Sequence, residues 1–191
     1  MTRIVYVDPT TAAPAVRESL QALPDLKLFH VVAHAETAFR PWLELGGALL
    51  GSLQLSPVLR ELAVLAVADS TGSTYEWAQH ESIATSVGVR PEQVRALGAG
   101  ATGMAANGAN FDDTERLVVD VAREAARTGS AGEAQVRALA GSLGERQVVE
   151  LLLVVGYYVG IALLTRTLDL EPDAPPRLGV VDAAVQRQVP A

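Results

Sequence analysis

The chain has 191 residues and a mass of 20.1 kDa, and 49% of its residues are apolar, so a substantial core can form within one domain. A formal net charge of −7 and a pI near 4.9 argue against nucleic acid and anionic membranes as default partners. The sequence has no cysteine, which excludes disulfides, thiolate metal sites and a cysteine nucleophile and fits a cytoplasmic protein.

The first third of the chain predicts helices separated by prolines. After an irregular start that lacks the charged and apolar regions of a signal peptide, Ala13–Leu23 predicts a short helix that ends before Pro24. Leu26–Phe39 has apolar residues at helical spacing and predicts the next helix. We expect Pro41 to interrupt the chain and to start a separate helix over Pro41–Ser52.

The middle of the chain carries clear helix boundary signals. Ser56 is a typical N-cap before a proline at the first helical position, and it predicts a helix that runs to Ala68 and is broken by Gly72. Ser73 then predicts the N-cap of a second helix, and Gly88 predicts its end in a left-handed conformation. This second helix carries most of the polar chemistry of the chain.

The rest of the chain also predicts helices. A short helix is expected over Pro91–Leu97, and the small residues of Gly98–Asn110 predict a linker between two halves. Asp112, with Glu115 three residues later, predicts a capping box that opens a helix ending at Gly129. Two more helices are expected over Ala131–Ala140 and Glu145–Leu168.

These signals predict an all-α fold of about seven or eight helices. Alternation of apolar and polar residues never persists beyond four or five positions, so no sheet is expected. We expect one domain over residues 1–170, followed by a proline-containing tail over residues 171–191. Glu61 and Glu150 each open a strongly apolar helix, which suggests two similar halves.

The apolar segment Val148–Leu164 raises the question of a membrane span. It covers about 17 residues, contains Glu150, and is interrupted by Gly156 and Gly160, so it is short for a span. We expect a soluble protein without membrane contact. Because this helix is apolar nearly all round, we also expect a homo-oligomer, a dimer or trimer, that buries it.

The candidate site lies in Thr74–Ala84, which concentrates polar and aromatic side chains in an otherwise aliphatic chain. Glu76, His80 and Ile83 share one face of the predicted helix. Glu61 lies on an apolar face of the preceding helix, where an unpartnered carboxylate is costly. A buried Glu beside a His predicts a proton relay that operates near neutral pH.

Structural alternatives exist for each of these residues. Glu76 can be the second half of a capping box with Ser73, and Glu61 can simply pair with Arg60. His80 can be a hydrogen-bonded core histidine, and the neighbouring Tyr75 and Trp77 can serve packing alone.

The segment Leu59–Val89 resembles the carboxymuconolactone decarboxylase family, which includes the alkylhydroperoxidase D-like proteins. The resemblance rests on Arg-Glu-Leu, an apolar helix, Tyr-Glu-Trp, a His three residues later and a Gly-Val exit. It implies an all-α fold that oligomerises, with pockets bounded by subunit contacts. In the peroxidase branch a Cys-x-x-Cys pair precedes the His, and those positions correspond to Ser73 and Glu76, whereas Glu61 and His80 match the family's Glu and His.

The resemblance therefore implies proton transfer without redox chemistry. Neither Ser nor Glu can pass through a sulfenate or a disulfide, so thiol peroxidase activity is excluded. The decarboxylase branch, which acts on a small carboxylated lactone, is the nearer match. We accordingly predict a cofactor-free acid–base lyase or isomerase acting on a small carboxylated or lactone-like metabolite. A non-catalytic binding or scaffold protein of the same fold is the alternative.

Individual roles follow from this prediction. His80 is expected to exchange a proton with the substrate while Glu61 sets its tautomer, and Tyr75 or Glu76 is expected to hold the polar end of the substrate. The predicted binding residues are His34, Trp42, Trp77 and Ile83. His30 and His34 have the i, i+4 spacing of metal ligands, but the acidic residue of a zinc-protease motif is missing, so no metal is predicted.

Overall fold

The structure is a computed structural model that describes residues 2–98 and 111–174, and within these ranges it is all-α, with nine helices and no strand. The all-α prediction is confirmed. The predicted linker, apart from Gly98, and most of the predicted tail lie outside the described residues. The helices are α1 (Pro14–Ala22), α2 (Lys27–Val32), α3 (Glu36–Gly51), α4 (Pro57–Thr71), α5 (Thr74–Val87), α6 (Pro91–Gly98), α8 (Asp113–Thr128), α9 (Glu133–Leu143) and α10 (Glu145–Thr167).

The caps of α4 and α5 form as the sequence predicts. Ser56 Oγ accepts a hydrogen bond from the Leu59 amide at 3.2 Å, and α4 continues three residues past Ala68 before Gly72 ends it at φ +66°. Ser73 Oγ accepts a bond from the Glu76 amide at 3.4 Å. These caps fix where α4 ends and α5 begins, and so set the relative register of the two helices that carry the site.

The chain breaks before α3 rather than at Pro41, so that prediction is wrong. α2 and α3 are separated at Ala33–Ala35, and α3 runs through Pro41 without interruption. Pro41 removes one helical hydrogen bond, the one to the Thr37 carbonyl. Burial of Phe39 and Leu43 on the same helix offsets this loss.

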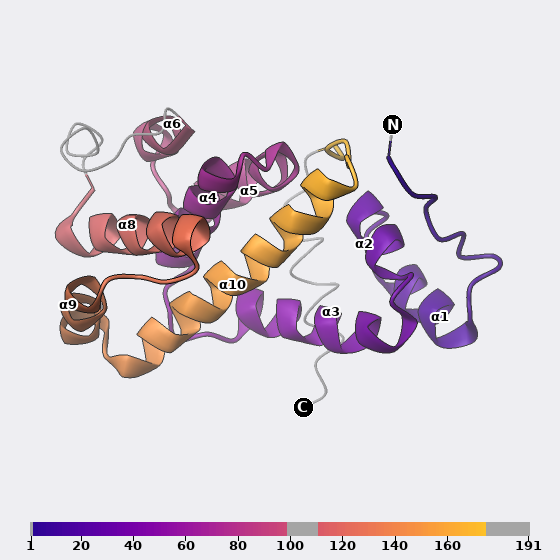
Figure 1. Cartoon of the computed structure of the whole chain (residues 1–191), viewed down its shortest axis with the longest axis horizontal. Helices are drawn as coiled ribbons and strands as arrows, with labels where there is room; N and C mark the ends of the chain where they lie inside the picture. The colour runs from indigo at the N-terminus through magenta and orange to yellow at the C-terminus, as the bar shows by residue number, and fades with distance from the viewer. Residues whose placement is uncertain (1, 99–110, 175–191) are drawn as a thin grey trace.

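Helix α4 forms the centre of the core. Its residues Leu62–Ala68 are at most 2% exposed, and it packs against α5, α8 and α10. Helix α10 crosses the molecule diagonally, with α1 and α2 on one side and α8 and α9 on the other (Figure 1). A helix buried on all sides presents its polar residues to neighbouring helices, and Glu61 is therefore presented to α5.

Helix α10 is long and apolar enough to span a membrane by length and composition. Its mean hydropathy reaches 2.2 over the best window, and 50% of that window is buried in the protein. Leu151, Val154 and Tyr158 face the core, whereas Leu153 and Leu163 are exposed. A core helix of a soluble protein can have the same length and composition, so the solubility of this protein stays a prediction.

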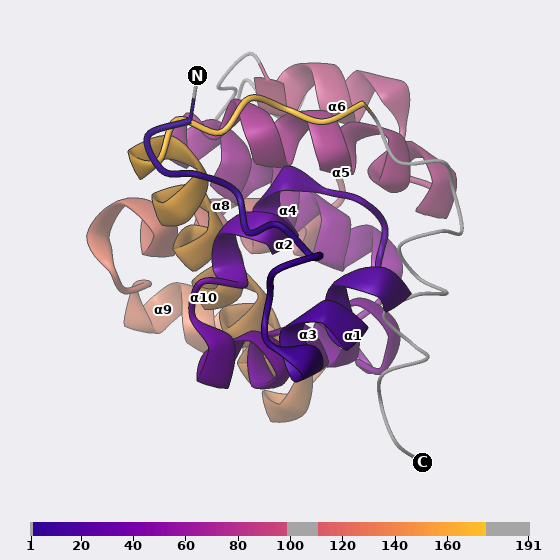
Figure 2. The same ribbon diagram turned by 90° about the vertical axis from the view of Figure 1, so that its right-hand side faces the viewer.

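The segment that follows α10 returns across the N-terminal part of α5 (Figure 2). The Lys27 amide at the start of α2 donates to Asp173 Oδ2 at 3.0 Å, and the Gln79 side chain donates from Nε2 to the Asp173 carbonyl at 3.2 Å. We call residues 171–173 the strap. The strap holds α2 against α5 and so closes one side of the candidate site.

Candidate active site

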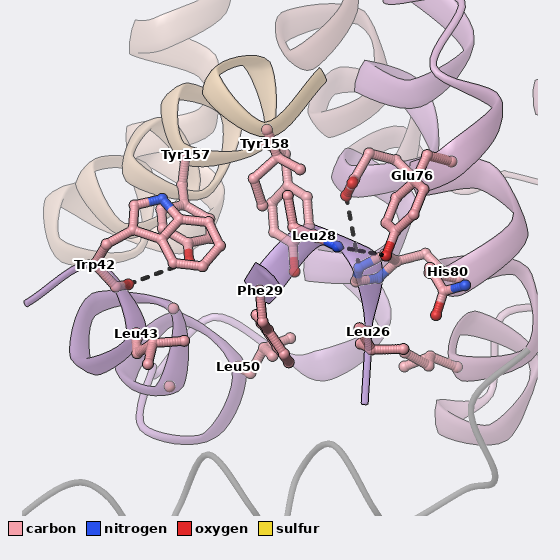
Figure 3. A pocket seen from close by; sticks show the side chains of 16 residues that line it. Leu26, Leu28, Phe29, Trp42, Leu43, Leu50, Glu76, His80, Tyr157 and Tyr158 are labelled. Atoms are coloured by element: carbon pink, nitrogen blue, oxygen red, sulfur yellow. Dashed lines mark hydrogen bonds and ion pairs between the residues drawn. The ribbon is translucent and has the colours of Figure 1, made fainter. Parts of the chain in front are cut away.

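A small cavity of about 80 Å³ lies between α2, α3, α5 and α10 (Figure 3). Its walls are mainly aliphatic and aromatic, with Leu28 and Phe29 from α2 and Trp42 from α3. The polar side chains that line it come from α5 and α10: Tyr75, Glu76, Gln79, His80, Tyr157 and Tyr158. An apolar cavity with a few converging polar groups is the usual form of a small-molecule site.

Glu61 lies behind His80 and holds its ring. Glu61 Oε2 is 2.7 Å from His80 Nδ1, and Glu61 Oε1 accepts a hydrogen bond from Arg60 Nε at 2.9 Å. The carboxylate of Glu61 is fully buried, and Arg60 and His80 are each 6% exposed. Glu61 therefore pairs with Arg60 and also orients His80, so the two alternatives for this residue are both realised.

The charges of this group stabilise one another. Burial raises the pKa of the Glu61 carboxyl, but the charges and hydrogen bonds of His80 and Arg60 outweigh it, so the net pKa lies below the ordinary value. Burial lowers the pKa of the His80 imidazole, but the Glu61 carboxylate more than reverses this, so the net pKa is raised. Nδ1 is therefore the proton donor to an ionised Glu61, and Nε2 is the atom left for a substrate.

Glu76 faces His80 from the other side. Glu76 Oε2 is 4.0 Å from His80 Nε2, and burial, opposed by His80 and reinforced by Glu61, raises the pKa of the Glu76 carboxyl to about 7. The Glu76 side chain does not complete a capping box, because the Ser73 amide already donates to the Ala68 carbonyl at 2.9 Å. Glu76 is thereby free to line the cavity.

Tyrosines from α10 complete the wall beside His80. The His80 and Tyr158 rings meet edge to face at 4.8 Å and 89°, and burial raises the pKa of Tyr158 well above its ordinary value, so it stays neutral. Tyr157 stacks on Trp42 at 5.1 Å and donates from its hydroxyl to the Trp42 carbonyl at 3.2 Å. Gly46 makes room for this hydroxyl, because a Cβ at Gly46 would overlap it.

Tyr75 is committed to the strap. Its hydroxyl donates to Asp173 Oδ2 at 2.5 Å and accepts from the Leu28 amide at 3.4 Å. Burial together with Asp173 raises the pKa of Tyr75, which keeps the phenol protonated. Tyr75 therefore lines the cavity but does not have a hydroxyl available to hold a substrate, as we expected it to have.

The structure brings most of the predicted site residues together and leaves two outside. Glu76, His80, Tyr75, Trp42 and Ile83 line the cavity, with Glu61 directly behind His80. His34 is exposed, and its Nε2 donates to the Val5 carbonyl at 2.7 Å instead of lining the cavity. Trp77 turns away from the cavity and lies against Gly98.

Besides apolar wall residues, four residues with polar groups shape the site without having been predicted. Gln79, Tyr157, Tyr158 and Asp173 each line the cavity or contact a residue that does. Two adjacent tyrosines within an aliphatic helix were a usable signal, as was the position of Gln79 one turn after Glu76. Asp173 offers no such signal, because it reaches the site only through folding of the strap.

No group of three or more His, Asp or Glu side chains in residues 2–98 and 111–174 has the geometry of a metal site. His30 bonds to the Val7 carbonyl through Nδ1 at 2.9 Å and to Asp25 Oδ1 through Nε2 at 2.7 Å. Together with His34 it ties the N-terminal segment to α2, which is a structural role.

Comparison with known proteins supports the resemblance drawn from the sequence. The model of the carboxymuconolactone decarboxylase family matches residues 36–112, which span α3 to the start of α8. No curated protein matches the chain significantly. A structure described as an alkylhydroperoxidase AhpD core, an uncharacterized peroxidase-related protein from Ralstonia eutropha JMP134, superposes with a TM-score of 0.75 at 17% identity, covering 90% of this chain and 92% of that one.

An uncharacterized peroxidase-related protein from Silicibacter sp. TM1040 superposes with a TM-score of 0.70 at 18% identity, over 91% of this chain and 96% of that one. At this level of identity the two structures establish the shared fold only.

Proposed function

We propose that this chain, which matches the carboxymuconolactone decarboxylase family over residues 36–112 and has the alkylhydroperoxidase D-like fold, is a cofactor-free acid–base enzyme. Its substrate would be a small carboxylated or lactone-like metabolite, and its reaction a decarboxylation, an isomerisation or a related proton transfer. The supporting observation is the row Glu61–His80–Glu76, whose last two members line one cavity.

In the proposed mechanism His80 exchanges a proton with the substrate through Nε2. With neutral His80, Nε2 removes a proton from a carbon next to a carbonyl, and the resulting imidazolium is stabilised by Glu61 at 2.7 Å. Protonated Glu76 donates to the oxygen on which negative charge develops. Return of the proton from Nε2 to another carbon of the substrate completes an isomerisation. Because Glu76 has a pKa of about 7, both of its protonation states are available near neutrality.

An unsaturated lactone tests this proposal without knowledge of the natural substrate. α-Angelica lactone has acidic protons beside its carbonyl, and its isomerisation in D₂O is followed by proton NMR. We expect the wild-type protein to accelerate isomerisation and deuterium uptake, and His80→Gln to lower the rate about 10²- to 10⁴-fold. Ser82→Ala, two residues after His80 on the same helix but outside the cavity lining, is the control and should leave the rate unchanged.

Equal rates for the wild type and for His80→Gln would overturn the proposal. A protein with the cysteine-based peroxidase chemistry of related folds would instead consume hydroperoxide with a dithiol donor, and we expect none here because the chain has no cysteine.

The alternative is a non-catalytic binding protein. That function would be favoured by a His80 packed without a void, whereas the cavity beside His80 supports catalysis. A cytoplasmic location, a small-molecule partner, independence from cofactors and the lack of nucleic-acid and membrane partners remain predictions from the sequence.

A further inference from the structure

We infer that the ligand of this cavity is an uncharged, mainly apolar molecule with one O–H or N–H group that donates to Gln79 Oε1, and that carboxylates bind poorly. This inference rests on the proposed function in taking the cavity as the substrate site. It narrows the proposed substrates from carboxylated or lactone-like compounds to the neutral ones.

In the part of the chain that the structure describes, the cavity offers a carboxylate no cation other than His80, whose charge is already matched by carboxyl groups. Among the described residues no Arg or Lys lines the cavity. The charge of Arg60 acts on His80, but its guanidinium is bonded to Glu61 and to the Leu50 carbonyl. His80 itself lies between two carboxyl groups, that of Glu61 at 2.7 Å and that of Glu76 at 4.0 Å. A buried anion without a cationic partner is strongly disfavoured.

Gln79 provides an acceptor that the protein does not use. Its Nε2 donates to the Asp173 carbonyl at 3.2 Å. Because a carbonyl oxygen can only accept, this bond assigns the nitrogen and the oxygen of the Gln79 amide. Gln79 Oε1 is then buried without a hydrogen-bond partner in the described part of the chain. Gln79 is 6% exposed and lines the cavity. A buried acceptor of this kind is costly unless a ligand donates to it.

The cavity walls specify shape as well as charge. Trp42, Tyr157 and Phe29 bring aromatic surfaces to one side, with Trp42 and Phe29 meeting edge to face at 6.5 Å. The volume of about 80 Å³ is roughly half that of an engineered apolar cavity of about 150 Å³ that binds benzene, so the ligand can be no larger than one small ring. The aromatic walls favour a flat molecule, and its polar group would point to the α5 side, where the polar side chains Gln79, Glu76 and His80 lie.

Three compounds that share a furan ring test the inference. Furfuryl alcohol carries an O–H donor, 2-acetylfuran carries only acceptors, and 2-furoate is an anion. Binding is measured by NMR titration at about pH 8, where Glu76 with its pKa of about 7 is mainly ionised. We expect furfuryl alcohol to bind at least about tenfold more tightly than 2-furoate, and more tightly than 2-acetylfuran.

One variant and a control test whether Gln79 Oε1 causes the preference for furfuryl alcohol. Gln79→Met removes the acceptor and keeps the length of the side chain, so it should abolish the advantage of furfuryl alcohol over 2-acetylfuran. Ser82→Ala is the matched control, because Ser82 Oγ is also buried and unpartnered in the described residues but does not line the cavity. It should leave the ranking of the three compounds unchanged.

The inference would be overturned if 2-furoate bound as tightly as furfuryl alcohol to the wild-type protein, or if furfuryl alcohol did not bind up to its solubility limit. Both outcomes are measured as binding to the wild-type protein, so they depend neither on the folding of a variant nor on turnover. A correct ranking without His80-dependent isomerisation would refute the proposed function alone. His80-dependent isomerisation with a preference for 2-furoate would refute the inference alone.

Discussion

Glu76 carries a buried carboxyl group whose ionisation is disfavoured in the folded protein. Its carboxyl has a pKa raised to about 7 from an ordinary value of 4.5, chiefly by burial. Because this pKa is raised on folding, the Glu76 carboxyl contributes more to the stability of the folded state below pH 4.5 than at high pH. This contribution is lost as the pH rises through about 7. Above that pH the folded protein holds a buried carboxylate.

Replacing Glu76 with Gln removes this dependence on pH. We expect Glu76→Gln to be more stable than the wild type above pH 7, by at most about 3 kcal/mol, and the difference to shrink progressively toward pH 4.5. Urea unfolding followed by circular dichroism at several pH values measures it. A difference in unfolding free energy that stays constant across this range would show that the Glu76 carboxyl does not titrate as described.

The core of the site was predictable at the level of single residues. Glu61, Glu76 and His80 stand out because each is a titratable group on an apolar helical face, where burial follows from spacing alone. His34 was wrongly placed in the site because helical spacing shows which residues share a face but not which neighbour that face meets. Its ring meets the N-terminal segment through Val5.

At the scale of helices, the approach of α3 to α10 depends on Gly46. A Cβ at this position would overlap the Tyr157 hydroxyl, which is itself held by the Trp42 carbonyl. We expect Gly46→Ala to destabilise the protein by about 1–3 kcal/mol, because the Tyr157 ring must shift in a packed wall. Thermal and urea unfolding measure the change, and the furan compounds should bind the variant less tightly.

Gly141→Ala on α9 is the control for this substitution. A Cβ at Gly141 would meet nothing within 4 Å, so the change should be neutral or stabilising by about 0.5–1 kcal/mol through helix propensity. If Gly46→Ala behaved like Gly141→Ala, close packing between α3 and α10 would not matter for stability.

Helix ends were more predictable than helix interruptions. Caps such as Ser56, Ser73 and the Asp112–Glu115 box depend on contacts within three residues, and all of them form. The tolerance of α3 for Pro41 depends on burial against other helices, which no local pattern reveals. Local chemistry fixes a cap, whereas a break reflects the balance between one lost bond and the packing of a whole helix.

At the scale of the whole molecule, one face of α10 remains exposed and apolar. Its large exposed side chains are Val149, Leu152, Leu153 and Leu163, and Leu45 on the neighbouring α3 is exposed as well. We propose that a second copy of this chain covers this face, which gives the dimer or trimer expected from the sequence. An apolar surface of this kind is typical of contacts between subunits.

Leu153→Glu tests the proposed assembly. Leu153 is 51% exposed, so the substitution should be tolerated by the fold, but it places a charge in the centre of the proposed contact. We expect the wild type to sediment as a dimer or trimer at micromolar concentration, and the variant to sediment as a monomer. A wild type that sediments as a monomer would contradict the proposal, as would a variant that assembles like the wild type.

The overall architecture was the most predictable feature, and its long-range contacts were the least. The all-α class follows from periodicity over the whole chain, but the strap does not, because Asp173 meets Tyr75 across 98 positions of sequence. The division into two similar halves and the boundary of the domain at residue 170 stay predictions. The strap does show that the segment just after this boundary packs against the domain.

Helix α10 contributes both to the cavity wall and to the exposed apolar face, so these two surfaces are coupled through one helix. Tyr157 and Tyr158 form a wall of the cavity, and Leu153 and Leu163 lie on the exposed side of the same rigid helix. Association that shifts this helix also reshapes the cavity, and thermodynamic reciprocity then requires an occupant of the cavity to alter association by the same factor. Under the proposed assembly, we therefore expect the affinity for a small molecule to vary with protein concentration, so that self-association would control the site.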